Sequence, residues 1–382
     1  MKMDSKIRNI FWIFISIGVV VIFLLYKVLI LSLLMNGIPI MREHYDIANL
    51  IANVIDIISI IIIMLIVAIV ILHRKNSNKL LELYEENNLR MKKISRISGA
   101  LLISMLLSSI LSGVVLVIME TLNLPLDMQS IKVICGSIAS VGYFYFFRLF
   151  TKEIGKININ EISLNKKFSV WDGIGYLLVL LGGTTILSGI TDIILEFIKR
   201  YLVHTENVGV VENYIGNVPA WILLVCVVII SPVFEELLFR KVLLEELLPY
   251  GKITAILISS MLFGMLHANL EQFLYTIFMG IVCANIVLIT GKVRYAIYLH
   301  MAFNLFGAII SGYIPSGRYT ILTEIIFVIS AAIIVIHKAK TVFIIKDEAN
   351  VNKFNFKKEF CGIGFIMFMV YWIISCVDAI AY

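Results

Sequence analysis

The most restrictive feature of this sequence is a series of apolar runs, each about 20 residues long and separated from the next by a short polar segment. A helix of this length spans the hydrocarbon layer of a lipid bilayer, because an α-helix rises about 1.5 Å per residue. Over 382 residues, 60% of the side chains are hydrophobic, 15% are charged, and the mean hydropathy is +0.98. The sequence therefore predicts an all-α, polytopic transmembrane helical bundle.

Boundaries placed at charged and turn-forming residues predict about eleven spans. These lie near residues 10–34, 47–72, 97–119, 131–149, 172–197, 219–240, 253–268, 272–290, 295–313, 320–336 and 361–381. The first run follows basic residues, as in a signal peptide, but it is longer than one and lacks a small-residue cleavage site. We therefore expect it to be a retained signal-anchor helix.

Most of the 32 basic residues fall in alternate connections: the N-terminal segment, 73–96, 148–167 and 337–360. Cytoplasmic loops of membrane proteins are enriched in Lys and Arg. This pattern predicts a cytoplasmic N-terminus and explains the net charge of +6 without a nucleic-acid partner. The abundance of Ile, Lys and Asn further suggests a multi-pass protein of a bacterial cell membrane.

Function is expected to reside in polar side chains within the spans, since such groups are costly in lipid unless they are paired, hydrated or used. Three motifs place such side chains at four-residue spacing: Glu235-Glu236-x-x-x-Arg240, Phe263-x-x-x-His267 and His300-x-x-x-Asn304. Residues four apart share one helix face, so Glu236 is expected to pair with Arg240, leaving Glu235 free. His300 and Asn304 likewise offer two hydrogen-bond donors toward one point.

Helix rise predicts that the three motifs lie at similar depth. Glu235 is 14 residues before Pro249 and His267 is 15 residues after Lys252, so both lie about 21–23 Å from the turn between them. His300 follows Arg294 closely on a later span. One shallow cavity, open to the cytoplasm, is therefore expected to hold all three motifs.

Such a cavity would suit hydrolysis without a nucleophilic side chain. A carboxylate and a histidine can withdraw a proton from water, and two donors opposite can stabilise the oxyanion formed when that water attacks an amide. A structural alternative remains open: a buried Glu–Arg pair can fix helix register, and a His–Asn pair can join helices. A proton-coupled transporter is disfavoured, because the sequence shows no inverted repeat.

The ordered set of motifs resembles the CPBP family of CAAX proteases and bacteriocin-processing enzymes, which includes the type II CAAX prenyl endopeptidases. The resemblance implies a protease core at 171–313, preceded by N-terminal transmembrane helices at 1–170. Transmembrane helices and a basic cytoplasmic loop follow at 314–382. It also implies an intramembrane endopeptidase in which Glu235 and His267 activate water and His300 and Asn304 form the oxyanion hole.

Three further residues, Glu236, Arg240 and Phe263, are implied to support that site. One departure from the family pattern is Lys241, where glycine often follows the motif arginine. No cofactor is favoured, so we expect glutamic-type rather than metallo-type chemistry. Zinc remains an alternative, with Glu235, His267 and His300 as its ligands, although they do not form an HExxH motif.

The expected partners are the lipid bilayer and a membrane-associated peptide or protein substrate, such as a peptide pheromone or a bacteriocin leader. Two other functions are compatible with the same motifs. One is a catalytically inactive scaffold or regulator with the same fold. The other is a bacteriocin self-immunity protein.

Overall fold

A computed structural model describes residues 93–122, 125–151, 158–198, 200, 214–342, 360 and 362–381. The predicted spans at 10–34 and 47–72 lie outside these described residues. Residues 80–382 form one compact unit, and the description below concerns this unit alone.

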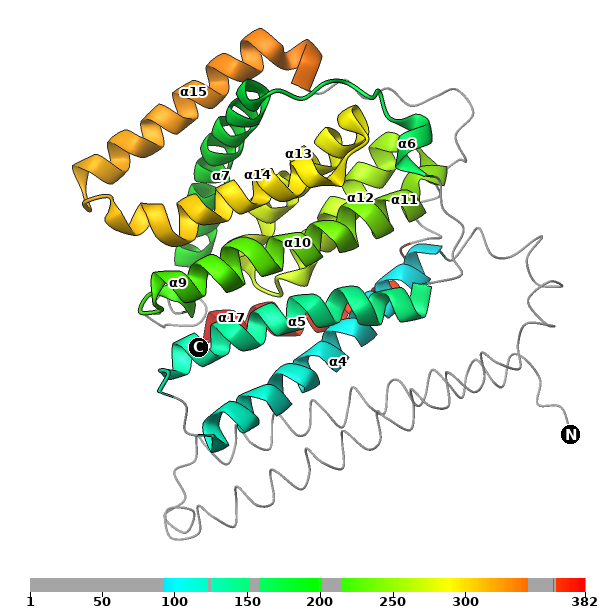
Figure 1. The fold of residues 1–382 in the computed structure, drawn as a ribbon, viewed down its shortest axis with the longest axis vertical. Helices are drawn as coiled ribbons and strands as arrows, with labels where there is room; N and C mark the ends of the chain where they lie inside the picture. The colour runs from blue at the N-terminus through cyan, green and yellow to red at the C-terminus, as the bar shows by residue number, and fades with distance from the viewer. Residues whose placement is uncertain are drawn as a thin grey trace, which may run out of the picture. The chain divides into compact units, whose positions relative to one another are not determined.

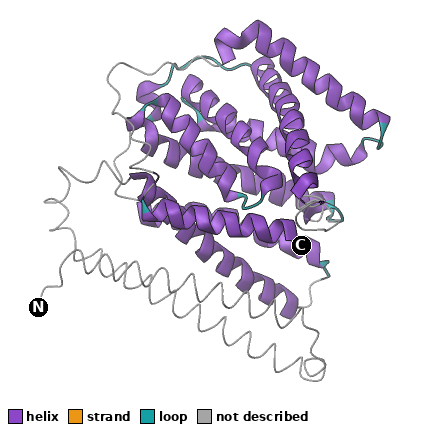
Figure 2. Ribbon diagram, turned by 180° about the vertical axis from the view of Figure 1, so that it is seen from behind, coloured by secondary structure: helices purple, strands orange, loops and turns teal. Residues whose placement is uncertain are grey.

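The described residues are helical and contain no strand, which confirms the all-α class (Figure 1, Figure 2). The separate helices are α4 (Lys93–Thr121), α5 (Met128–Thr151), α6 (Ile159–Ile162), α7 (Val170–Ile198), α12 (Lys252–Leu266), α13 (Leu270–Thr290), α15 (Arg318–Val342) and α17 (Ile363–Ala381). Two composite helices cover Ala220–Tyr250 and Val293–Tyr313. Within the described residues, eight helices are long and apolar enough to cross a membrane. The total of eleven spans stays a prediction.

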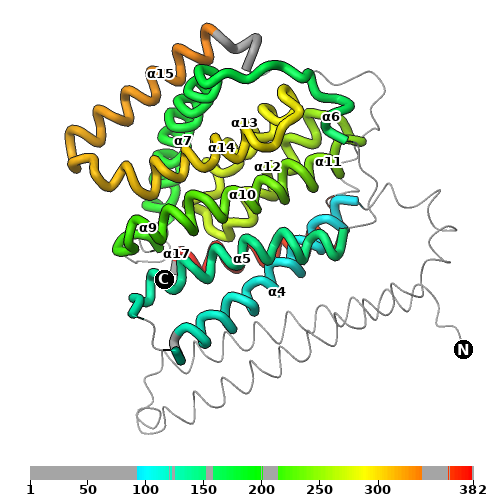
Figure 3. Tube along the Cα trace, viewed as in Figure 1, coloured from blue at the N-terminus to red at the C-terminus, as the bar shows by residue number. Residues whose placement is uncertain are grey.

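Figure 3 shows the path of the composite helix Ala220–Tyr250 through the unit, and its winding changes around the first motif. Its α-helical parts are α9 (Ala220–Leu223), α10 (Ser231–Glu236) and α11 (Leu244–Leu247), and π-helical turns occupy Leu224–Ile230 and Leu237–Leu243. Pro232 lies at the start of α10 and has no backbone N–H to donate to the preceding turn. Wider turns of this kind are frequent at functional sites, where they redirect side chains.

Helices α12 and α13 form an antiparallel hairpin. α12 has 15 residues and is about 22 Å long, so it is too short to cross a typical hydrocarbon layer. The hairpin turn is short because Asn269 caps α13, its side-chain oxygen accepting a hydrogen bond of 2.8 Å from the amide of Gln272. The two helices approach closely at Gly280, where a Cβ atom would lie 2.8 Å from Cβ of Ser260.

The composite helix Val293–Tyr313 begins with α14 (Val293–Leu305) and continues through a π-helical turn at Phe306–Ile310. α15 follows it and packs along α7. α17, the last described helix, packs on α4, where the amide of Gly364 donates a 2.9 Å hydrogen bond to the hydroxyl of Ser95.

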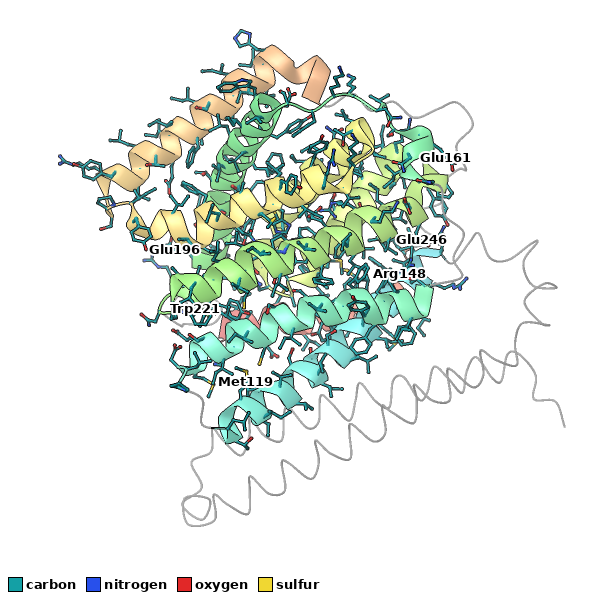
Figure 4. The ribbon with its side chains drawn as sticks, viewed as in Figure 1. Met119, Arg148, Glu161, Glu196, Trp221 and Glu246 are labelled. Atoms are coloured by element: carbon teal, nitrogen blue, oxygen red, sulfur yellow. The ribbon has the colours of Figure 1, made fainter. Side chains whose placement is uncertain are left out.

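The long helices of this unit run between two ends, which we name by their connections. The basic end carries the helix ends near residues 151, 170, 248, 252, 290 and 293, with Lys166, Lys167, Lys252 and Lys292. The far end carries the helix ends near residues 121, 128, 198, 220, 313 and 318. In Figure 4 the labels Arg148, Glu161 and Glu246 mark the basic end, and Met119, Glu196 and Trp221 mark the far end.

Each end has polar contacts that fix a helix terminus. At the basic end, Lys93 of α4 pairs with the buried Glu246 at 3.3 Å, and Lys241 pairs with Glu245 at 2.7 Å. At the far end, Asp127 caps α5 by accepting hydrogen bonds from the hydroxyl and the amide of Ser130, at 2.6 and 2.9 Å. These bonds stabilise the charged form and lower the pKa of the Asp127 carboxyl.

Candidate active site

Glu236 connects two helices from a fully buried position. One carboxylate oxygen lies 3.2 Å from Nε of Arg240, one helical turn later, as the motif spacing predicts. The other oxygen lies 3.0 Å from Nδ1 of His300 on α14. Because a carboxylate accepts hydrogen bonds, the Nδ1 proton of His300 is donated to Glu236. Glu236 therefore sets both the orientation and the tautomer of that histidine.

Arg240 is buried behind Glu236 and has no exposed surface. Its guanidinium carbon lies 4.9 Å from the ring centroid of Phe263, a distance that allows a cation–π interaction. Its contact with Glu236 is an ion pair whose geometry is not that of an aligned hydrogen bond, and its nitrogens have no hydrogen-bond partner among the described residues. Its guanidinium carbon also lies 5.8 Å from the ring centroid of Phe239, so Glu236 and two aromatic rings surround the arginine.

Glu235, the neighbouring carboxylate, points away from Arg240 and remains partly accessible, with 14% of its side chain exposed. One of its oxygens accepts a hydrogen bond of 3.4 Å from the hydroxyl of Ser140 on α5. The same hydroxyl lies 3.4 Å from that of Ser231, one turn before Glu235. The other carboxylate oxygen lies 3.9 Å from Nε2 of His300.

Sequence reasoning did not single out Ser140 and Ser231. The only local signal was a hydroxyl in each of two apolar runs, and serine is common in membrane helices as a packing residue. The contact between Ser140 and Glu235 joins residues 95 positions apart, so it depends on how α5 packs against the composite helix.

His267 lies at the C-terminal cap of α12 and is held there by its own helix. Its Nδ1 lies 3.0 Å from the backbone oxygen of Phe263, and its ring meets the Phe263 ring edge to face, with centroids 5.0 Å apart. A carbonyl oxygen only accepts, so Nδ1 carries the proton and Nε2 of the neutral ring keeps a free lone pair. His267 is therefore arranged to accept a proton or a hydrogen bond through Nε2.

The turn after His267 has an unusual backbone. Ala268 has φ of +53°, a left-handed conformation that residues with a Cβ adopt rarely. Asn269 stabilises this turn through its side-chain nitrogen, which donates to the backbone oxygen of His267 at 2.7 Å and to the side chain of Gln272 at 2.9 Å. Strained turns of this kind often occur where a side chain is held for function.

Asn304 lies one turn after His300 on α14, and its side-chain nitrogen donates a 2.9 Å hydrogen bond to the backbone oxygen of Val227. Val227 belongs to the π-helical turn Leu224–Ile230 of the composite helix. The amide group carries two hydrogens, so one donor of Asn304 remains available.

A cavity of about 760 Å³ joins these residues, and Glu235, His267, His300 and Asn304 all line it. Its volume lies within the range of ligand-binding cavities. The three expected supporting residues, Glu236, Arg240 and Phe263, do not line the cavity, and each is buried behind it. The structure thus gathers all seven residues of the sequence motifs in one region, in two layers.

The cavity lies in the half of the unit nearer the far end. Its lining includes residues 181–192 of α7, 133–140 of α5 and 320–327 of α15, which lie from about the middle of these helices toward the far end. The expectation that the cavity opens to the cytoplasm stays a prediction. Helix rise predicts the height of the motifs along their helices. The direction in which the cavity opens depends instead on how side chains pack around it. Toward the basic end, Phe239, Leu243 and Phe263 are completely buried.

The alternative zinc site requires Glu235, His267 and His300 to lie close enough together to bind one metal ion. Within the described part of the chain, no three His, Cys, Asp or Glu side chains are grouped so that they could hold a metal ion. Glu235 and His300 approach each other, and the contacts of Nδ1 of His300 with Glu236 and of Nδ1 of His267 with a backbone oxygen leave Nε2 of each ring available, but His267 is not grouped with the other two closely enough to complete a set of three ligands. Glu235, His267 and His300, as placed here, do not form a zinc site.

Comparison with known proteins identifies the motif-bearing segment. Residues 217–306, which contain all three motifs, match the family model described as "Type II CAAX prenyl endopeptidase Rce1-like". The chain is also similar to a protein of Bacillus subtilis (strain 168) named "Putative membrane peptidase YdiL", with 33% identity over 105 residues. That alignment covers 27% of this chain and 41% of the relative. The chain therefore spans about two fifths of the length of this relative. No solved structure matches the chain. The segment 217–306 is therefore an Rce1-like domain, which confirms the family predicted from the order and spacing of the motifs.

Proposed function

We propose that this integral membrane protein is an endopeptidase that hydrolyses a peptide bond of a membrane-associated peptide or protein, using water activated by Glu235 and His267. The observation that supports this proposal most is the gathering of Glu235, His267, His300 and Asn304 around one cavity. They come from three segments of the chain, and each makes a polar contact that restricts its orientation.

The proposed chemistry requires a particular charge state at the contact between Glu235 and His300. With the Nδ1 proton of His300 donated to Glu236, Nε2 of a neutral ring is an acceptor, and so is an ionised Glu235. Two acceptors 3.9 Å apart are favourable neighbours only when a proton is shared between them. When His300 carries that proton, Glu235 is a free base and Nε2–H of His300 is a donor.

Hydrolysis then follows in balanced steps. Glu235 accepts a proton from water while the water oxygen bonds to the carbonyl carbon of the substrate. The oxyanion receives hydrogen bonds from Nε2–H of His300 and from the free amide hydrogen of Asn304. When the carbon–nitrogen bond breaks, the proton held by Glu235 passes to the amine, leaving a carboxylic acid and an amine as products.

His267 has a positioning role in this scheme. Its Nε2 lone pair can accept the second hydrogen of the attacking water, because Nδ1 is already engaged by the Phe263 carbonyl. A water whose two hydrogens are held by two acceptors has an oxygen lone pair directed at the substrate carbon. Binding of the water therefore also orients it for attack. Metal-free, glutamic-type hydrolysis is the form of the reaction that these residues support as placed.

A second candidate function is an inactive scaffold with the same fold. It is favoured by the complete burial of Glu236 and Arg240, since a buried ionic network can serve helix register alone. The two functions differ at Glu235, which is partly accessible and faces the cavity. A scaffold does not require an ionisable carboxylate at position 235.

The proposal is tested by comparing membrane peptides from cells that lack the protein with those from cells expressing wild type, Glu235→Gln or Glu161→Gln. Glu161 is an exposed carboxylate of α6 and serves as the matched control. We expect shortened peptides with wild type and Glu161→Gln and none with Glu235→Gln at equal abundance. Equal processing by Glu235→Gln would reject the endopeptidase and favour the scaffold.

A further inference from the structure

The segment that precedes α7 crosses the basic end of the unit and is bound there to the end of α13. We call its residues 158–168 the strap. The amide of Leu164 donates a 3.1 Å hydrogen bond to the backbone oxygen of Leu288, and the amide of Lys166 donates one of 3.0 Å to that of Ile289. Because the last carbonyl groups of a helix have no partner within it, the strap satisfies two of them and is held in place.

Side-chain packing joins the strap to the turn after α13 and to the start of α14. Gly291 in that turn has φ of +72°, and a Cβ atom there would lie 2.7 Å from the hydroxyl oxygen of Ser163. The ring centroid of Phe168 lies 4.7 Å from that of Tyr295 and 5.9 Å from that of Tyr176. The strap and the start of α14 are distant in the sequence, and these contacts make them one ordered surface.

Four basic side chains lie on this surface, and we call them the basic site: Lys166, Lys167, Lys292 and Arg294. All four are exposed, and none has an ion-pair partner among the described residues. The guanidinium carbon of Arg294 lies 5.1 Å from the ring centroid of Tyr295, which leaves its charge at the surface.

The acidic residues of the same segments do not neutralise the basic site. Residues 158–172 contain two acids, Glu161 and Asp172, and residues 288–298 contain none. Asp172 accepts hydrogen bonds from the amide and the hydroxyl of Ser169, at 2.9 and 2.7 Å, and so caps the start of α7. The surface therefore keeps a net positive charge and attracts anions.

Exposed apolar side chains border the basic site. Val170 and Trp171 at the start of α7 are 79% and 77% exposed, and Tyr298 of α14 is 61% exposed. Tryptophan and tyrosine are enriched where membrane helices pass from the headgroup layer into the hydrocarbon. An anionic phospholipid has both a charged headgroup and acyl chains, so it matches cations and exposed rings together. A free phosphate ion would use the cations alone.

We propose that the basic site binds the headgroup of an anionic phospholipid, whose acyl chains lie beside Trp171 and Tyr298. Each Lys or Arg near an anionic headgroup adds attraction that falls off within a Debye length, so four cations fixed on one surface act together. A topological bias places basic residues in a loop, but it does not require that loop to be bound to the end of α13. The site is independent of peptide cleavage.

Quenching of Trp171 fluorescence by brominated lipid tests this proposal. Trp171 is kept as the single tryptophan of the chain by combining Trp12→Phe, Trp221→Phe and Trp372→Phe, and the protein is reconstituted in phosphatidylcholine. Brominated phosphatidylglycerol or brominated phosphatidylcholine is then titrated in at low salt. We expect an approximately tenfold preference for phosphatidylglycerol, which disappears when all four basic-site residues are replaced by glutamine.

Two controls separate this site from general effects of charge. A protein that keeps only Trp221 places the fluorophore at the far end, where that side chain is 63% exposed. Arg318→Gln removes a cation that lies 4.9 Å from the ring centroid of Tyr319, an arrangement like that of Arg294. We expect equal quenching by the two lipids at Trp221, and no effect of Arg318→Gln on the preference at Trp171.

Several results would overturn the proposal. Equal quenching of Trp171 by the two lipids would do so, as would a preference that survives the four glutamine substitutions or that is equally strong at Trp221. Displacement of phosphatidylglycerol by inorganic phosphate, beyond that by chloride at equal ionic strength, would show a simple anion site. If the fourfold variant fails to accumulate, Lys167→Gln combined with Lys292→Gln replaces it and should lower the preference about threefold. An unchanged preference in that double variant would also reject the site.

Discussion

Nδ1 of His300 and Oε1 of Glu236 lie 3.0 Å apart, and this contact joins α14 to the composite helix Ala220–Tyr250. The second oxygen of Glu236 faces Arg240, so one buried carboxylate neutralises an arginine and orients a histidine. Glu235, which immediately precedes Glu236 in the sequence, faces the cavity instead. Two adjacent glutamates therefore have different surroundings, and the predictions below follow from that difference.

Removal of Arg240 should destabilise the protein strongly. Arg240→Ala leaves Glu236 charged and buried without its ion-pair partner, and loss of one member of a buried pair costs about 3–5 kcal/mol. Glu235→Gln leaves this pair intact and should change stability little. Thermal unfolding of both variants in the same detergent measures the difference, and equal midpoints would contradict the division of roles between the two glutamates.

Loss of the Asn304 side chain should slow cleavage more than it weakens substrate binding. Asn304→Ala removes one proposed oxyanion donor, and such a loss typically lowers kcat by about 10²–10³-fold with KM little changed. Ser311→Ala, a cavity residue farther along the same composite helix, is the control and should keep kcat. A rise in KM with unchanged kcat would place Asn304 in substrate binding instead of oxyanion stabilisation.

The turn after His267 should tolerate glycine better than any residue with a side chain. Ala268 has φ of +53°, and a left-handed conformation costs a residue with a Cβ about 1–2 kcal/mol that glycine avoids. Ala268→Gly should therefore raise the unfolding midpoint, and Ala268→Val should lower it. In the interior of α12, Ala255→Gly should have the opposite effect and lower the midpoint, since glycine costs about 1 kcal/mol within a helix. A fall in midpoint with Ala268→Gly would contradict the assigned turn.

The contact between α7 and α15, which both line the cavity, should depend on Gly182. A Cβ there would lie 2.6 Å from Cβ of Ala331 and would also meet the backbone oxygen of Phe327, so Gly182→Ala should separate the helices and lower stability. Gly175 lies in the same helix with nothing within 4 Å of its Cβ position. Gly175→Ala should therefore be neutral or stabilising. Equal effects of the two substitutions on the unfolding midpoint would contradict this packing.

The sequence was informative where structure follows local periodicity. The apolar runs predicted helices close to the observed ones; the run at 97–119, for example, lies within Lys93–Thr121. The i,i+4 rule predicted the Glu236–Arg240 pair, because that contact lies within one helix. The span predicted at 253–268 likewise lies close to α12, which covers Lys252–Leu266.

Contacts between distant segments were not predictable in this way. Ser140 reaches Glu235 only through the packing of α5, and Asn304 reaches the Val227 carbonyl, 77 residues earlier, only through the packing of α14 on the composite helix Ala220–Tyr250. The direction in which the cavity opens does not follow from residue counts for the same reason. Depth follows from residue counts, but access depends on which side chains fill the space around the motifs, such as Phe239 on the basic side.

The central claim, that Glu235 activates a water for peptide hydrolysis, is tested most directly with purified protein in H₂¹⁸O. A peptide identified by the membrane comparison is incubated with wild type, Glu235→Gln and Glu161→Gln at matched folding, and the products are weighed by mass spectrometry. We expect one ¹⁸O in each new carboxyl group with wild type and Glu161→Gln, and no product with Glu235→Gln. Full turnover by Glu235→Gln, or product without ¹⁸O in its new carboxyl group, would contradict the mechanism.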